Sequence, residues 1–435
     1  MTALAFKLDP TATAFRADFA RNCGDLPGAG LPWLDARRRA ALDAFAKTGI
    51  PTRRVEAWKY TDLANALESD FKPATRFQGT LPDDSPLGPA SGARLTLVDG
   101  FLHRASGTDG VEFVDLGGID ARTPDWVKDN LGLMAAGADQ PLGAASLGLM
   151  RGGVGLRIRN EAAVHLDFVN SAREQGFVSH ARVLIVVENR ALLRLLESHT
   201  GDGAQQSLAN IGMELVLKQG ARLEHVRLQA ESALALHVTS VGASLARDAE
   251  YRALYAALGA RLSRIDANLR LGAPGAHATI HSVAALNAGI ADVTTVMDHA
   301  SSHTLSRQLF KNVVGGNGRA VNQGRVVVRE GAVKSDSHQL FKSLLLSLRA
   351  ETDAKPELEI FADDVICGHG TAIGDLDKDA LFYLRTRGIP EEEAKGLLIR
   401  AFLEEAIDGF ADEAVHDALW RRLDCVLASM GWSES

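Results

Sequence analysis

The chain has 435 residues, which exceeds the usual size of one domain and predicts two or three folding units. Hydrophobic residues make up 46% and charged residues 23%, so a disordered or fibrous protein is not expected. Lys and Arg total 47 against 55 Asp and Glu, and no long basic block is present, so nucleic acid is not an expected partner.

The three cysteines are Cys23, Cys367 and Cys425. They are too few and too scattered for a disulfide framework, and their odd number leaves at least one thiol free. The N-terminus shows no basic segment followed by a long apolar run, and no stretch approaches the roughly 18 apolar residues of a membrane span. We therefore expect a soluble, cytoplasmic protein with no membrane partner, in which Cys23 and Cys425 are structural.

Residues 1–92 are predicted to form an N-terminal helical domain. Apolar residues recur at helical spacing through 31–50, and the pattern ends at Gly49 and Pro51. Residues 79–93 are rich in Pro, Gly, Ser and Asp, as in a loop, so a domain boundary is placed there.

Residues 93–374 are predicted to form the β core. Short runs of Val, Leu and Ile, such as "GVGLRIRN" and "ARVLIVVENRALL", are separated by Gly, Asn and Asp, which indicates strands. The turn "VVENRALL" is echoed by "VLKQGARL" about thirty residues later, a weak period typical of stacked solenoids. No helix is expected between these strands, which disfavours a doubly wound sheet. The pattern predicts a mainly β protein whose core is a parallel β-helix or, failing that, a large β-sandwich, and the periodicity alone does not decide between them.

Residues 375–435 are predicted to form a C-terminal helical domain. One helical segment closes on Gly388, and the next opens with Pro390 and three glutamates in its first turn. A terminal bundle of this kind either caps the β core or offers a docking surface, and the pattern does not separate these roles.

The stretch "DDVICGHG" contains the candidate ligands Cys367 and His369. A strand would point both side chains to one face, about 6.6 Å apart along the chain. Gly368 and Gly370 leave the backbone open to a ligand or another chain. Thiolate and imidazole together suit iron, zinc or copper, but two ligands from one strand cannot complete a four-coordinate site. Another subunit could supply the rest; the alternative is a buried Cys and a hydrogen-bonded His at a strand end.

Three other pairs of ionisable residues could imitate functional sites but are given structural roles. They are His299 with His303, His277 with His281, and Asp363 with Asp364. The first pair falls in strand and loop sequence, where a spacing of four does not bring ligands together. The second fits the polar outer face of a strand, and the adjacent aspartates would face opposite sides.

Motifs for nucleotide binding, serine hydrolysis and closed zinc sites are absent. The sequence contains no GxxxxGK[ST], strand-borne GxGxxG, GxSxG, HExxH or CxxC. No ATP site and no tightly bound cofactor are therefore expected on this chain.

Residues 355–402 resemble the C-terminal signature of the SufB/SufD family of iron-sulfur cluster assembly scaffolds. The Cys-x-His-Gly element is most similar to the SufD branch, and the length and the lack of further cysteines agree with that branch. Residues 321–347 resemble the preceding family segment, and residues 54–63 resemble the N-terminal motif. The residue between Cys and His, often Ser in the family, is Gly368 here.

This resemblance implies a right-handed parallel β-helix between helical ends, and assembly with SufB and with the ATPase SufC. His369 matches the family histidine at the SufB/SufD interface where a transient iron-sulfur cluster is built, and Cys367 is its neighbour. ATP use would belong to SufC, which docks on the C-terminal helical domain. The candidate docking residues are Phe382, Tyr383, Arg385, Arg387 and Gly388.

The resulting expectation is a non-catalytic scaffold subunit of an iron-sulfur cluster assembly complex, which could pair with itself when isolated. Two alternatives stay open at this point. One is a purely bracing subunit in which Cys367 and His369 only pack, and the other is a β-helical carbohydrate-active enzyme.

Overall fold

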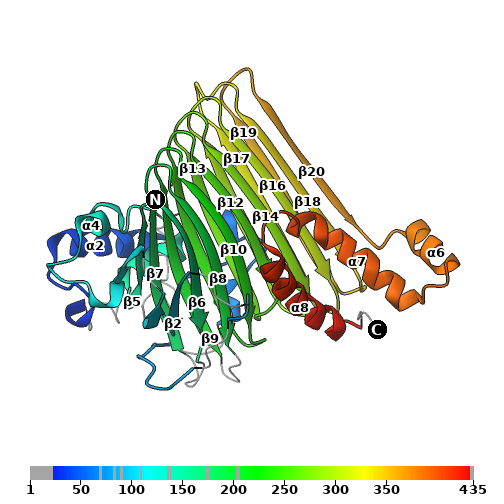
Figure 1. Ribbon diagram of the computed structural model, residues 1–435, viewed down its shortest axis with the longest axis horizontal. Coiled ribbons are helices and arrows are strands. Elements are labelled where there is room, and N and C mark those ends of the chain that lie inside the picture. The colour runs from blue at the N-terminus through cyan, green and yellow to red at the C-terminus, as the bar shows by residue number, and fades with distance from the viewer. Residues whose placement is uncertain are drawn as a thin grey trace, which may run out of the picture.

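The computed structural model shows two long, mostly parallel sheets wound into one coil, with helices at both ends of the chain packed on its outside (Figure 1). The N-terminal segment, in which no targeting pattern was expected, lies outside the described residues, as does the side chain of Cys23. The structure describes residues 23–67, 71–81, 85–88, 92–107, 110–134, 137, 139–171, 177–201 and 206–431.

Each sheet contains ten strands within the described part of the chain. Sheet A consists of β1 (Lys72–Pro73), β4 (Val111–Asp115), β5 (Gly152–Ile158), β7 (Phe177–Val187), β9 (Ser207–Leu217), β11 (Leu236–Leu245), β13 (Leu262–Leu271), β15 (Ile290–His299), β17 (Arg319–Val328) and β19 (Glu351–Ile360). Sheet B consists of β2 (Ala93–Val98), β3 (Phe101–Ser106), β6 (Glu161–Val169), β8 (Leu192–Gly201), β10 (Arg222–Glu231), β12 (Glu250–Ala257), β14 (His277–Leu286), β16 (Leu305–Val314), β18 (Asp336–Leu345) and β20 (Ile366–Gly374).

From β5 onward the chain alternates between the two sheets, so each pair of strands completes one turn of a coil. Strands in adjacent turns are parallel, and antiparallel pairing occurs only where β3 meets β2 and β4 meets β5 among the described strands. The period read from the sequence is visible in one column of register partners along sheet B: Leu192, Arg222, Glu250, His277, Leu305, Asp336 and Ile366. The parallel β-helix is confirmed, and the β-sandwich alternative is wrong.

The interior of the coil is filled by every second side chain of each strand. One interior column of sheet B stacks Leu193, Leu223, Tyr251 and Ala278 from successive turns, and all four are buried in the largest apolar cluster. Because side chains alternate between the two faces of a strand, the remaining residues point outward, where helices or solvent meet them.

The helices and 3-10 turns of the described chain have the following bounds: η1 (Cys23–Asp25), α2 (Pro32–Thr48), η2 (Glu56–Trp58), α3 (Leu63–Ala66), η3 (Leu116–Gly118), α4 (Asp125–Asn130), α5 (Pro141–Gly148), α6 (Lys378–Thr386), α7 (Glu391–Ile407) and α8 (Glu413–Ser429). Helices α2 and α5 pack their apolar residues on the outer face of sheet A. Helices α7 and α8 cover part of the outer face of sheet B. No helix of the described part is both long enough and apolar enough to cross a membrane.

Helices α4 and α5 interrupt the region in which no helix was expected, so that expectation was wrong. Every residue of α5 is buried, between α2 and the outer face of sheet A. A short helix that is covered on all sides carries no polar face, so it leaves no helical period in the sequence. The division into three folding units, 1–92, 93–374 and 375–435, stays a prediction.

The coil ends at β19 and β20, the last strands of their sheets. No described strand pairs with the far edge of either one. Figure 1 shows these two strands along the side of the coil away from the N-terminal helices. The last turn therefore exposes both its strand edges and the inner faces of its strands.

Candidate functional site

Cys367 and His369 lie on the inner face of the last turn. They are the register partners of Ser337 and Gln339 in β18, whose side chains are buried in the interior. Parallel partners point the same way, so the predicted pairing of the two side chains on one face is what the register shows. Since no further turn follows β20, this inner face opens to the end of the coil.

The two side chains differ in exposure. Cys367 is partly buried and packs against the interior apolar cluster, whereas His369 is exposed. His369 has no hydrogen-bond partner among the described residues. The alternative of a hydrogen-bonded histidine at a strand end does not describe His369, while packing does describe part of the Cys367 environment.

Burial raises the pKa of the Cys367 thiol above its usual range. A hydrogen bond from the backbone of Ser337 opposes this shift, and the charge of Asp336 adds to it. Since the thiolate is the form that binds metal, the thiol of the isolated chain is a poor ligand until a cation or partner stabilises its anion.

No further side chain of the described residues joins Cys367 and His369 to complete a metal site. Among the residues that the structure describes, no group of three His, Cys, Asp or Glu side chains is placed to hold a metal ion. His338 precedes Gln339 on β18 and therefore points to the outer face, where its Nε2 lies 3.2 Å from Asp336. It cannot join His369 as a ligand from that side of the sheet.

The interior behind Cys367 and His369 changes from apolar to polar over the last turns. The column that ends in Cys367 continues inward through Ser337 and Ser306, whose hydroxyl oxygens lie 2.7 Å apart. The column that ends in His369 continues through Gln339 and Gln308. Sequence analysis missed these residues, although the alternation of Ser, Gln and Phe along β18 was a usable signal.

Several amide atoms in this polar region lack hydrogen-bond partners among the described residues. They are Nε2 and Oε1 of Gln339, Nε2 of Gln308 and Nδ2 of Asn322. All three side chains are buried, with Gln339 2% exposed. A buried polar atom without a partner costs about 1–3 kcal/mol, so their grouping next to one candidate site calls for a physical explanation.

The candidate docking residues gather on and just after α6. Phe382 and Tyr383 are 67% and 56% exposed, and no residue of α6 is buried. Arg387 donates from Nη2 to the hydroxyl of Tyr383 at 3.0 Å, and Arg385 pairs with Glu391 of α7 at 3.2 Å. Gly388 ends the segment with a φ of 87°, a left-handed conformation that favours glycine. Figure 1 shows α6 projecting away from the coil.

The pairs assigned structural roles are dispersed. His299 is buried at the end of β15, where its ring nitrogens bond Thr304 and Ser306, while His303 lies on the exposed loop that follows. His281 faces outward and its Nδ1 lies 2.9 Å from the carbonyl oxygen of Ala406 in α7.

His277 and Asp364, from the other two pairs, also have the structural roles expected for them. His277 contacts Thr279 on the outer face, and Asp364 pairs with Lys334 at 2.6 Å. Cys425 is exposed on α8, so the structural role expected for it is wrong.

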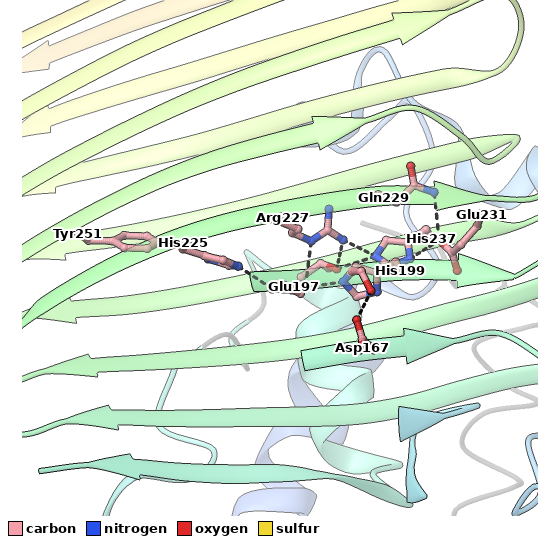
Figure 2. A network of polar contacts seen from close by, with 11 residues as sticks. Asp167, Glu197, His199, His225, Arg227, Gln229, Glu231, His237 and Tyr251 are labelled. Carbon is pink, nitrogen blue, oxygen red and sulfur yellow. Dashed lines mark hydrogen bonds and ion pairs between the residues drawn. The ribbon is translucent and has the colours of Figure 1, made fainter. Parts of the chain in front are cut away.

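A second polar cluster, which sequence analysis also missed, lies deep inside the coil (Figure 2). Glu197 is fully buried and accepts hydrogen bonds from His225 at 2.8 Å, from Arg227 at 3.0 Å, and from His199. Burial would raise the pKa of Glu197, but these donors hold it well below its usual range. Burial lowers the pKa of His199 to about 3, so this ring is neutral near pH 7.

The same cluster reaches Glu231 at the C-terminal end of β10. Gln229 donates to Glu231 at 3.0 Å, and Nδ1 of His237 lies 2.7 Å from the same carboxylate. Figure 2 shows Arg227 in the middle of these side chains. With a guanidinium in that position, the cluster is a network of mutually neutralised charges rather than a cation site.

Two protein-family models match the chain. Residues 168–402 match the model described as SUF system FeS cluster assembly, SufBD core domain, and residues 13–80 match the SufBD protein N-terminal region. The chain belongs to the SufBD family of iron-sulfur cluster assembly proteins. The resemblance read from three sequence segments is thus confirmed over more than half of the length.

Curated relatives of this SufBD protein are similar over nearly their whole length. The iron-sulfur cluster assembly protein SufD of Escherichia coli is 28% identical over 88% of this chain and 90% of its own. A SufBD family protein of a Synechocystis strain is 27% identical over 89% of this chain and 90% of its own. A chloroplastic protein of Arabidopsis thaliana, ABCI7, is 28% identical over 90% and 85%. The chain is therefore SufD-like, and family membership gives no support to a carbohydrate-active enzyme.

Proposed function

We propose that this SufBD protein is a non-catalytic scaffold subunit whose last turn faces a SufB-like partner, and that a transient iron-sulfur cluster is built at that contact. His369 lends an imidazole ligand to the cluster, and Cys367 lends a thiolate once the anion is stabilised. The observation that carries the proposal is the position of both side chains on the open inner face of the last turn, with His369 exposed.

The unpaired edges of β19 and β20 support a partner at this end of the coil. Long exposed strand edges are templates for pairing with another chain, and natural proteins cover or blunt them. β19 carries Pro356, a residue typical of edge strands, and a charged residue at each outward position, all acidic except Lys355. A partner that pairs with these edges would bring its own side chains over His369 and complete the coordination that this chain leaves open.

Helix α6 is proposed as the docking site of a SufC-like ATPase. An exposed aromatic pair next to arginines is the composition typical of interface hot spots. Phe382, Tyr383 and Arg385 on α6, which has no buried residue, form such a group with Arg387 just after the helix. ATP hydrolysis would then take place on the partner, and this subunit would transmit its movements to the coil.

Two further expectations stay within this proposal. In the absence of its partner the chain could pair with a second copy of itself through the same strand edges. We also propose a cytoplasmic location for this chain, although one relative is a chloroplastic protein.

The ligand role is tested by reconstituting the chain with SufB-like and SufC-like partners and supplying ferrous iron and sulfide without oxygen. We expect His369→Ala to lower the cluster yield, read from visible absorption, while sizing shows an intact complex. His338→Ala is the matched control, because His338 lies one residue from the partner of His369 but points outward. A cluster yield from the His369→Ala complex equal to that of the unmodified complex would leave only the bracing role.

A further inference from the structure

Gln339 stands directly beside His369. The two residues are register partners on adjacent parallel strands, so their side chains leave the same face about 4.8 Å apart. Gln339 is 2% exposed, and neither atom of its amide has a hydrogen-bond partner among the described residues. A buried carboxamide without a partner among the described residues therefore lies directly beside the candidate ligand.

The surroundings of this amide are shaped to admit it. A Cβ atom at Gly324 on the facing strand β17 would lie 2.6 Å from Nε2 of Gln339 and 2.7 Å from the ring of Phe341. The rings of Phe341 and Phe310 stack with centroids 4.8 Å apart and form an apolar wall on the same face of sheet B. Rotation of the amide exchanges its oxygen and nitrogen and costs no hydrogen bond, since neither is engaged.

A histidine that binds a metal through one ring nitrogen has an N–H on the other. That N–H almost always donates to a carboxylate, a carbonyl or water, which sets the tautomer and the orientation of the ring. His369 has no such acceptor among the residues that the structure describes, and Gln339 has an unused carbonyl oxygen beside it.

We infer that Gln339 is the positioning residue of His369: its Oε1 accepts the imidazole N–H when the other ring nitrogen binds iron at the end of the coil. This rests on the proposed ligand role of His369. The free chain keeps an unsatisfied amide, and the hydrogen bond is formed only when a metal fixes the ring. Gln308, the partner of Gln339 one turn deeper, lies too far from the last turn to serve His369.

The positioning role predicts that Gln339→Leu has opposite effects on the stability of the free chain and on the iron affinity of the complex. In the free chain the substitution replaces an unpaired buried amide by an apolar side chain, so the thermal unfolding midpoint should equal or exceed that of the unmodified chain. In the complex with the SufB-like partner it should weaken binding of ferrous iron alone about 10- to 100-fold. A residue that only supported the fold would instead lower the unfolding midpoint.

The experiment measures ferrous iron binding by anaerobic equilibrium dialysis for the assembled complex with Gln339→Leu, His369→Ala and both changes together. We expect the double variant to bind no more weakly than His369→Ala, because Gln339 acts through His369. Gln308→Leu is the matched control and should leave the iron affinity unchanged. Gln339→Glu should keep the iron affinity that Gln339→Leu loses, because glutamate provides an acceptor oxygen. Cobalt(II) spectra of the same complexes report the ligand geometry independently of cluster formation.

The outcomes separate the two proposals. If His369→Ala leaves iron affinity unchanged, the ligand role fails, and the positioning role with it. If His369→Ala weakens binding and Gln339→Leu does not, the positioning role alone is wrong. Additive losses in the double variant, or equal losses in Gln339→Leu and Gln308→Leu, would also overturn it.

Discussion

The guanidinium carbon of Arg264 lies 4.0 Å from the centroid of the Trp58 ring. Nη2 of the same arginine donates to the carbonyl oxygen of Ala57 at 2.8 Å, and its Nη1 pairs with Asp292 on the next turn. Trp58 belongs to the N-terminal segment and Arg264 to β13, so one stacked pair anchors that segment on the outer face of the coil. Thr61, three residues later, also bonds Asp292.

We expect Trp58→Ala to destabilise the chain by about 3–5 kcal/mol, the range for loss of a buried large aromatic side chain. Trp58 is 1% exposed, and its loss also leaves the buried Arg264 without its stacking partner. Denaturant unfolding followed by circular dichroism measures the change. Phe382→Ala is the control: this aromatic side chain is 67% exposed, so its removal should change stability by less than about 0.5 kcal/mol.

His299 should make the fold sensitive to acid. Burial lowers its pKa to about 4, although the charges of Asp298 and Asp336 oppose the shift. The unfolded chain takes up a proton near pH 6.5 and the folded chain does not, so stability present above about pH 6.5 is lost as the pH falls toward 4. The loss attributable to this group approaches roughly 3 kcal/mol.

The test compares urea unfolding midpoints of the unmodified chain and His299→Gln between about pH 7 and pH 4.5. Glutamine keeps polar atoms near Thr304 and Ser306 but does not titrate. We expect the variant to lose less stability over this range, and the difference between the two proteins to be constant above about pH 7. Parallel pH profiles would show that His299 is not the responsible group.

Cys367 should react more slowly than Cys425 with iodoacetamide in the isolated chain near neutral pH. Burial raises the pKa of the Cys367 thiol and limits access to it, whereas Cys425 is exposed on α8. Peptide mass spectrometry over time gives both rates in one sample. Assembly with a SufB-like partner should slow the reaction of Cys367 further and leave that of Cys425 unchanged. Equal rates in the isolated chain would contradict the partly buried position of Cys367.

The double substitution Phe382→Ala with Tyr383→Ala should weaken binding of a SufC-like ATPase tenfold or more, equivalent to about 1.4 kcal/mol. Since both side chains are exposed, folding should be unaffected. Leu348→Ala removes a fully exposed apolar side chain from the loop between β18 and β19 and serves as the control. Undiminished affinity for the ATPase would place its docking surface away from α6.

Much of the fold could be predicted from local patterns. Alternating apolar residues and turn signals identified the strands, and the C-terminal helices were recognisable by their start and stop residues. Helix α5 was not predicted, because a helix that is buried on all sides leaves no amphipathic period. The Glu197 cluster was not predicted, because ionisable residues on strands are ordinarily assigned to the solvent side.

That Cys367 and His369 share one face could be read from their spacing alone, because the period of a strand is two and does not depend on what surrounds it. The folded coil was needed to show that this face is the inner one, that β20 is the last strand of its sheet, and that Gln339 lies beside His369. Those relations join residues that are far apart in the chain, and they follow from the length of each turn and the packing of the whole coil. No local window of sequence contains that information.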